Sequence, residues 1–231
     1  MRREKSSVEK ELPQKIEKNI FFLLEKKQRK VYDAVLYKYK NSFNSSKNKK
    51  QIFYKTFYEL KNIALIPLIT ALDTNDKTKY IKFKKVSEVF TALCKNRYKT
   101  IVISETPSFF KINGRFFEKF FVEKIIDYDT SAEEIERLIE EFNKGKIDAL
   151  FISSKVKLPK FKFYNVDAVI YTDPWHTENI EKYIENNGLK SIIIYNFYAL
   201  DTIEEKIYKL KSEKNISNFN FSEDEILKFF E

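Results

Sequence analysis

The sequence predicts an α/β protein in which a parallel sheet is covered by helices. Three apolar runs carry this prediction, namely DALFIS (148–153), DAVIYTD (167–173) and SIIIYNFY (191–198). Each run is continuous rather than alternating, which is typical of strands buried on both faces. Amphipathic helical patterns alternate with such runs along this part of the chain, and that order indicates right-handed crossovers within one sheet.

The first 79 residues are expected to form an N-terminal segment with a helical protrusion. A short alternating segment spans 16–24, and helical patterns follow over 28–39 and 52–66. The polar stretch between them, NSFNSSKNKK, reads as a loop.

Residues 80–231 are expected to hold the sheet. Apolar residues spaced for one helical face lie within 86–93, and the short apolar run TIVIS (100–104) follows as a strand. Ser131 and Glu134 form a capping box before a helix with an apolar stripe at i, i+3, i+4 and i+7.

The chain closes with two further helix starts. Thr202 is expected to cap a helix, with Glu205 three residues on, and lysines gather toward the end of that helix, where its dipole favours cations. A second capping box, Ser222 with Glu225, begins a last short helix.

The composition limits the classes of function. The 231 residues carry a net charge of +9, and nucleic acid is the usual partner of a basic protein. Lysine is spread along the whole chain, however, so the codon bias of an AT-rich genome would explain this excess of positive charge equally well. No apolar run approaches the ~20 residues of a membrane span, and the start has no apolar signal segment.

Two residues that often carry chemistry occur once each. Cys94 excludes an internal disulfide and a cysteine-based zinc site, and its apolar neighbours favour a buried position. His176 excludes a histidine cluster. We therefore expect no metal site, no catalytic residue of these types, and an intracellular location.

The segment DTIEEKI (201–207), placed after an apolar strand, resembles the end of the second motor lobe of Swi/Snf-type ATPases, DNA translocases of helicase superfamily two. That family closes the lobe with Gly-Thr-(Ile/Leu)-Glu-Glu-Lys-Ile, and here Asp201 replaces the glycine. The resemblance implies a RecA-like sheet, an N-terminal helical extension (1–79), and a helicase C-terminal lobe (80–231) with a C-terminal brace helix.

Further motifs of this family occur in the expected order. Leu12-Pro13-Gln14-Lys15 resembles its Leu-Pro-x-Lys motif, and TIVIS resembles its motif IV. The resemblance runs from Arg2 to about Lys214. The single positions that it carries over are Gln28, Tyr32, Lys84, Asp173, Trp175, Thr202, Glu204 and Glu205.

Departures from the family pattern bear on catalysis. The glycine-rich motif V is replaced by SKVKLPKFKFYN, and the arginine fingers of motif VI have no counterpart, because the last arginine of the sequence is Arg137. No GxxxxGK[ST] loop occurs to cradle phosphates. The expectation is a degenerate lobe that needs no cofactor and does not hydrolyse ATP alone. The lobe would bind ATP only if a separate chain carrying the first lobe supplied the phosphate-binding loop.

The SKVKLPKFKF loop is the candidate nucleic-acid site. Four lysines alternate there with apolar residues after a predicted strand, at the sheet edge where open α/β folds bind ligands. They are Lys155, Lys157, Lys160 and Lys162. The matching family loop touches the DNA backbone, so these lysines are expected to neutralise phosphates; the alternative is a solvated edge segment.

Three functions remain open from the sequence. The leading one is a nucleic-acid-binding lobe that contacts double-stranded DNA and docks on a first motor lobe. The second is a non-catalytic protein-interaction or regulatory subunit that kept the fold. The third is the product of a decayed gene, against which the intact helix caps argue.

Overall fold

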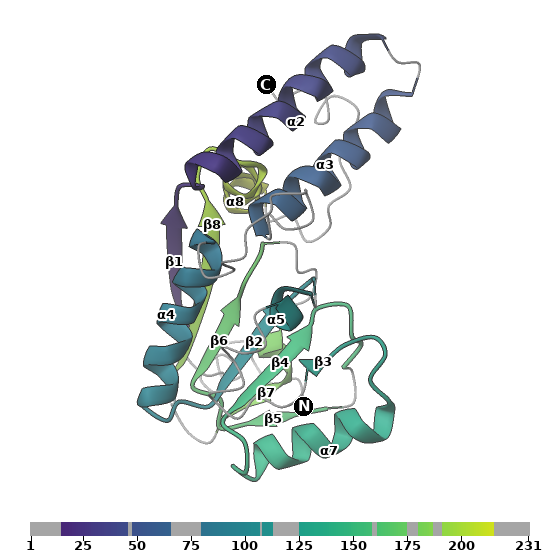
Figure 1. Ribbon diagram of the computed structural model, residues 1–231. Helices are drawn as coiled ribbons and strands as arrows, with labels where there is room; N and C mark the ends of the chain where they lie inside the picture. Colours follow the sequence, from purple (N-terminus) through teal and green to yellow (C-terminus); the bar gives the residue numbers. More distant parts are fainter. Residues whose placement is uncertain are drawn as a thin grey trace, which may run out of the picture. The chain divides into compact units, whose positions relative to one another are not determined.

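The computed structural model describes residues 15–45, 48–65, 80–106, 108–112, 125–158, 161–174, 180–186 and 191–214 (Figure 1). The chain divides into two compact units. Unit 1 comprises Met1–Asn19 and Ser87–Asn196, and unit 2 comprises Ile20–Val86 and Phe197–Glu231. Each unit is thus built from two stretches distant in sequence. The boundary predicted at residue 79 lies outside the described residues and stays a prediction.

A six-stranded sheet has the order β1-β8-β6-β2-β4-β3. Its strands are β1 (Lys15–Phe22), β2 (Thr100–Ser104), β3 (Ile125–Ile126), β4 (Ala149–Ser153), β6 (Ala168–Tyr171) and β8 (Ile192–Ala199). The pairs β2/β4, β2/β6, β3/β4 and β6/β8 are parallel. The predicted α/β class with a parallel sheet is confirmed, and its central strands are the predicted apolar runs.

Two short strands, β5 (Phe163–Tyr164) and β7 (Ile184–Glu185), form a separate parallel pair. A 3-10 turn, η3 (Ile180–Tyr183), leads directly into β7. The sequence prediction included neither strand, because each is only two residues long and has no periodic pattern to detect.

Within unit 1, successive side chains of a strand face opposite sides of the sheet and pack into two separate apolar layers. Leu150 and Ile152 of β4 join the core cluster that includes the buried face of α7 (Ala132–Asn143). Phe151 points to the opposite side, where its ring meets Phe90 and Phe110 edge-on. Because successive side chains of a strand face opposite ways, both faces of β4 are covered.

The predicted cap of α7 at Ser131 is confirmed. The N–H of Glu134 donates to Ser131 Oγ at 3.2 Å, so Ser131 caps the helix. The buried side chains of α7 are Ile135, Leu138, Ile139 and Phe142, as the stripe predicted. Burial of this stripe against the sheet orients the helix that precedes β4.

Helices dominate unit 2. Helices α2 (Lys26–Ser45) and α3 (Lys49–Leu65) pack along each other as a hairpin (Figure 1), and α8 (Ile203–Lys214) contacts α3. These are the predicted helical protrusion and brace helix. Helix α4 (Ile81–Lys95) begins in unit 2, and α5 (Ser108–Ile112) is a single short helix of unit 1.

Among the described helices, none is both long and apolar enough to cross a membrane. The described residues also contain no group of three or more His, Cys, Asp or Glu side chains arranged to hold a metal ion. The last predicted helix, from Ser222, lies outside the described residues.

Candidate functional site

Polar residues terminate three neighbouring strands of the sheet, at what we term the carboxyl edge. Ser104 ends β2, Ser153 ends β4, and Thr172 and Asp173 follow β6; all four are buried. A carboxylate oxygen of Asp173 accepts hydrogen bonds from Ser104 Oγ, Thr172 Oγ1 and the N–H of Glu105, each at 3.1 Å. Asp173 thereby ties the turn after β6 to the turn after β2.

Lys155 and Lys157 lie directly beyond β4 at this edge and are exposed. The N–H of Lys155 donates to Ser153 Oγ at 3.4 Å, which holds the backbone close to the strand end. Lys155 Nζ lies 3.8 Å from a carboxylate oxygen of Glu105. Lys155 is well exposed, and an ion pair of this kind contributes at most about 1 kcal/mol, so the ammonium remains available to an external anion.

Lys162 lies at the opposite, amino edge of the sheet. Its carbonyl accepts from Asn143 Nδ2 at 2.8 Å, at the end of α7. Next to it, the carbonyl of Tyr164 accepts from Lys99 Nζ at 2.8 Å, and Lys99 precedes β2. Lys162 Nζ pairs with Glu185 at 2.9 Å.

Lys155 and Lys157 therefore do not lie together with Lys162. Lys155 and Lys157 lie at the carboxyl edge of the sheet, whereas Lys162 lies at its amino edge. Lys160 and Trp175 lie outside the described residues, as does His176.

A second buried carboxyl group lies near the end of β6. The hydroxyl oxygen of Tyr171, the last residue of that strand, accepts from the N–H of Ile180 at 3.0 Å. The neighbouring Glu181 is buried, and its Oε2 has no hydrogen-bond partner in the described part of the chain. Burial raises the pKa of the Glu181 carboxyl and that of the Tyr171 hydroxyl, so the neutral form of each is favoured.

The remaining family-motif positions lie in unit 2, and four of them, Tyr32, Thr202, Glu204 and Glu205, lie around the start of α8. Thr202 Oγ1 donates to the carbonyl of Ala199 at 2.7 Å and accepts from the N–H of Glu204 at 3.1 Å. The N–H of Ile203 donates to the Tyr32 hydroxyl oxygen at 2.7 Å, and burial raises the pKa of Tyr32. Two N–H groups that a helix start leaves unpaired are thus satisfied by Thr202 and Tyr32.

Glu204 is fully buried and forms an ion pair with Lys82 of α4, which is equally buried. Its other carboxylate oxygen accepts from the N–H of Ala199 at 2.8 Å. The family resemblance carries over Lys84 on the same helix, but Lys84 is exposed. Lys82 is the residue that sequence reasoning missed.

Asp201 occupies the position at which the family has glycine. Its φ is +56°, in the left-handed region that glycine adopts readily and Asp tolerates better than most residues. The N–H of Asp201 donates to Glu205 Oε2 at 2.7 Å, and Glu205 pairs with Lys209 at 2.6 Å. The hydrogen bond from Lys209, followed by that from the backbone, lowers the pKa of Glu205.

Gln28 connects the two helices of the hairpin. It is buried, and its Nε2 donates to the carbonyl of Ile63 near the end of α3 at 2.6 Å. The adjacent Arg29 donates to the carbonyl of Asp201 at 2.7 Å and pairs with Asp33. These contacts join α2 to both α3 and the turn before α8.

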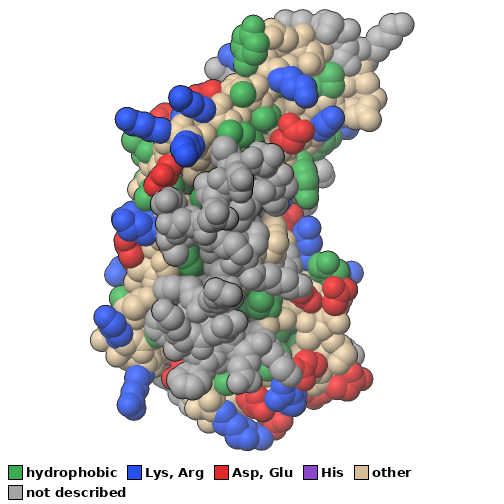
Figure 2. Space-filling view, in the orientation of Figure 1, with side chains coloured by type: hydrophobic (Ala, Val, Ile, Leu, Met, Phe, Trp, Pro, Cys, Tyr) green, Lys and Arg blue, Asp and Glu red, His purple; other side chains and the backbone are tan. Residues whose placement is uncertain are grey.

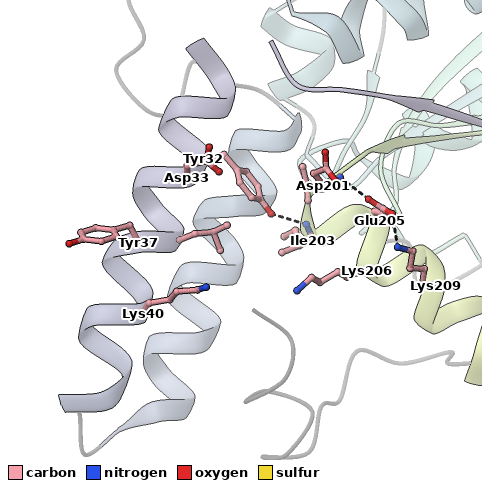
Figure 3. Close-up of a pocket in the computed structure, with 11 residues that line it drawn as sticks. Tyr32, Asp33, Tyr37, Lys40, Asp201, Ile203, Glu205, Lys206 and Lys209 are labelled. Carbon is pink, nitrogen blue, oxygen red and sulfur yellow. Dashed lines mark hydrogen bonds and ion pairs between the residues drawn. The ribbon is translucent and has the colours of Figure 1, made fainter. Parts of the chain in front are cut away.

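A pocket of about 520 Å³ lies beside this group, lined by α2 and the first turns of α8 (Figure 3). Three basic side chains face three acidic ones around it, namely Lys40, Lys206 and Lys209 with Asp33, Asp201 and Glu205. The charges balance, so the pocket favours neither an anion nor a cation. We interpret the unit 2 residues as a framework that positions α8, and the carboxyl edge of unit 1 as the candidate functional site.

Comparison with known proteins identifies sequence relatives over the whole chain. An uncharacterised ATP-dependent helicase of Mycoplasma genitalium is 25% identical over 257 aligned residues, and one of Mycoplasma pneumoniae is 24% identical over 256. The alignments cover 100% of this chain but 24% of each relative, so the chain spans about a quarter of their length. No protein-family model matches the sequence.

Solved structures show the same fold. The SWI2/SNF2 ATPase C-terminal domain of Sulfolobus solfataricus has a TM-score of 0.71 at 21% identity, covering 92% of both chains. The core of that ATPase in complex with double-stranded DNA has a TM-score of 0.77 at 20% identity, covering 94% of this chain and 50% of that one. The C-terminal part of the Fun30 ATPase domain has a TM-score of 0.72 at 14% identity, covering 95% and 96%.

The fold defines the class of domain. This chain has the RecA-like α/β fold of a helicase C-terminal lobe. More particularly, it has the fold of the second lobe of SWI2/SNF2 ATPases, and the resemblance noted in the sequence is confirmed.

Proposed function

We propose that this chain is the second lobe of a nucleic-acid-dependent motor and that Lys155 and Lys157 contact the phosphates of duplex DNA. One observation carries the proposal: these two lysines are exposed at the carboxyl edge of a parallel sheet, where open α/β folds bind their ligands. The structural neighbour solved with double-stranded DNA supports duplex as the ligand.

The chemistry of the edge fits a polyanion. The ammonium groups of Lys155 and Lys157 lie beyond β4, and they displace counterions from DNA when they contact its phosphates. The buried hydrogen bonds of Asp173 to Ser104, Thr172 and Glu105 fix the turns on either side, so the edge is preorganised for contact. Glu105 beside Lys155 reduces the local positive charge, and we therefore expect moderate affinity with a strong dependence on salt.

ATP hydrolysis requires more than this chain provides. Its 231 residues contain neither a phosphate-binding loop nor an arginine after Arg137. We propose that the lobe works with a first lobe carrying GxxxxGK[ST], located either in a longer polypeptide, as the length of the relatives suggests, or in a separate chain.

Replacing both edge lysines, Lys155→Gln with Lys157→Gln, is expected to weaken duplex binding about 10-fold at moderate salt. Loss of two phosphate contacts should also reduce the slope of log affinity against log salt by roughly 2. Fluorescence anisotropy of a labelled 20-base-pair duplex, titrated at several salt concentrations, measures both quantities.

The matched control is Lys95→Gln with Lys146→Gln, which removes two exposed lysines from the same unit, one at the end of α4 and one ahead of β4. This variant should lose much less affinity. Equal losses in the two variants would show that only the net charge matters, and the proposed site would then be rejected.

A further inference from the structure

The positive charge of the chain is concentrated in the α2–α3 hairpin. These two helices hold ten Lys or Arg residues and two Asp or Glu residues, which gives them a net charge of +8. The whole chain carries +9 by the same count. By contrast, α7 has five glutamates and one arginine. Lysine residues are spread along the sequence, but the excess of positive over negative charge is concentrated in this hairpin.

Most of the hairpin lysines are exposed and have no acidic partner. Figure 2 shows Lys and Arg side chains on the surface in the region where Figure 1 draws α2 and α3. Within the part of the chain that the structure describes, no ion pair involves Lys26, Lys27, Lys30, Lys38, Lys50 or Lys55. Asp33 is already paired with Arg29. The positive charges of these lysines are therefore exposed to solvent and available to an anionic ligand.

A groove between the two helices holds exposed aromatic rings among these charges. We term it the tyrosine groove; its volume is about 910 Å³, and its lining includes Val31, Val35, Tyr54, Lys55 and Tyr58. Tyr54 is 41% exposed and Tyr58 is 61% exposed. These tyrosines lie one helical turn apart, so their rings stand on the same side of α3.

Lysines border the groove from α2 as well. Lys27 precedes Val31 by four residues, and Lys38 follows Val35 by three, so all four residues share one stripe of the helix. Lys55 lies on the α3 side. Glu59, half-buried, is the one acidic residue among those that line the groove.

We propose that the tyrosine groove binds single-stranded nucleic acid, with Tyr54 and Tyr58 stacking on bases and Lys27, Lys38 and Lys55 contacting phosphates. Aromatic rings set among lysines match a flexible strand, whose unpaired bases expose faces for stacking and whose backbone carries regular negative charge. An acidic protein surface would use the lysines but leave the rings without a specific role, and duplex bases are already stacked on each other.

This inference goes beyond the proposed contact at the carboxyl edge, and the two rest on different residues in different units. The edge lysines are proposed for duplex, and the tyrosine groove for a single strand. Either proposal can fail while the other stands.

The test measures the fluorescence anisotropy of a labelled 15-nucleotide oligo-dT and of a labelled duplex, each titrated with the full chain or one of its variants. Tyr54→Leu with Tyr58→Leu should weaken oligo-dT binding about 10-fold and leave duplex binding nearly unchanged. Lys27→Gln with Lys38→Gln and Lys55→Gln should weaken oligo-dT binding and lower its salt slope by roughly 2, at about 0.7 per phosphate.

Matched controls exist in unit 1. Tyr128 is 70% exposed and Tyr164 is 42% exposed, so Tyr128→Leu with Tyr164→Leu removes two comparable rings. Lys95→Gln, Lys144→Gln and Lys146→Gln remove three exposed lysines. Circular dichroism melting shows which variants remain folded; should the double tyrosine variant unfold, Tyr54→Phe with Tyr58→Phe must retain binding, because the rings are kept.

The outcomes separate cleanly. Loss of oligo-dT binding in the groove variants alone, with Lys155→Gln and Lys157→Gln affecting only duplex, supports the inference. Equal loss in groove variants and controls overturns it. Equal loss on oligo-dT and duplex in the tyrosine variant also overturns it, because stacking on unpaired bases would not be the source of affinity.

Discussion

Replacing Lys82 with Met is expected to lower the free energy of unfolding by about 3–5 kcal/mol, the typical effect of breaking a buried ion pair. The change removes the positive charge of Lys82 from beside the buried Glu204 carboxylate, which still accepts the hydrogen bond from the N–H of Ala199. Urea unfolding at pH 7, followed by far-ultraviolet circular dichroism, measures the effect.

Two further variants make this prediction specific. Lys84→Met alters an exposed lysine on the same helix and should change stability by no more than about 0.5 kcal/mol. Lys82→Met combined with Glu204→Gln removes both charges and should recover much of the loss, because the amide oxygen of Gln still accepts from Ala199. If Lys82→Met and Lys84→Met are equally mild, the buried pair does not hold α4 to α8.

The purified 231-residue chain is expected to release no phosphate from ATP above background, with or without duplex DNA. The reason is chemical: no loop in the sequence supplies the backbone cradle and lysine for the β- and γ-phosphates, and no arginine follows Arg137. An arginine finger alone contributes roughly 10³ to 10⁵ in rate to such reactions. A coupled phosphate-release assay with an active translocase as the positive control measures this directly.

A duplex-stimulated ATPase activity that copurifies with the chain and disappears in Lys155→Gln with Lys157→Gln would contradict this expectation. It would show that the chain hydrolyses ATP through groups that the family pattern does not indicate. Activity unaffected by that variant would instead point to a contaminating enzyme.

Much of the fold could be predicted because local pattern and burial agree. The strands β4, β6 and β8 are continuous apolar runs, and both faces of β4 are covered by aromatic and aliphatic side chains. The start of α7 was predictable from Ser131 and Glu134, since capping depends on neighbours three residues apart.

Lys82 illustrates what the sequence could not show unaided. It lies four and eight residues before Val86 and Phe90, on the buried face of α4, and a lysine on an apolar stripe is a usable signal. Its partner, however, is 122 residues away in sequence. Periodicity cannot reveal such a pairing, and the family resemblance carries over Lys84 in place of Lys82.

Lys155 and Lys162 of the predicted lysine loop lie apart for a related reason. The alternating pattern of the loop suggests one surface, but Lys155 lies at the carboxyl edge and Lys162 at the amino edge. The contacts of Lys162 with Asn143 and Glu185 depend on the three-dimensional path. At Asp201, where the family has glycine, the sequence departs from the pattern, yet the backbone keeps a positive φ.

The central claim is that the carboxyl edge of the sheet touches duplex DNA, and photocrosslinking tests it most directly. Benzoylphenylalanine is placed at position 157, beyond β4 at the carboxyl edge, or at position 146, ahead of β4 at the amino edge. Each protein is irradiated with labelled duplex at a salt concentration that permits binding. We predict abundant DNA adducts from position 157, lost as salt rises, and few from position 146. Equal yields at the two positions, or none at 157 while the duplex remains bound, would contradict the claim.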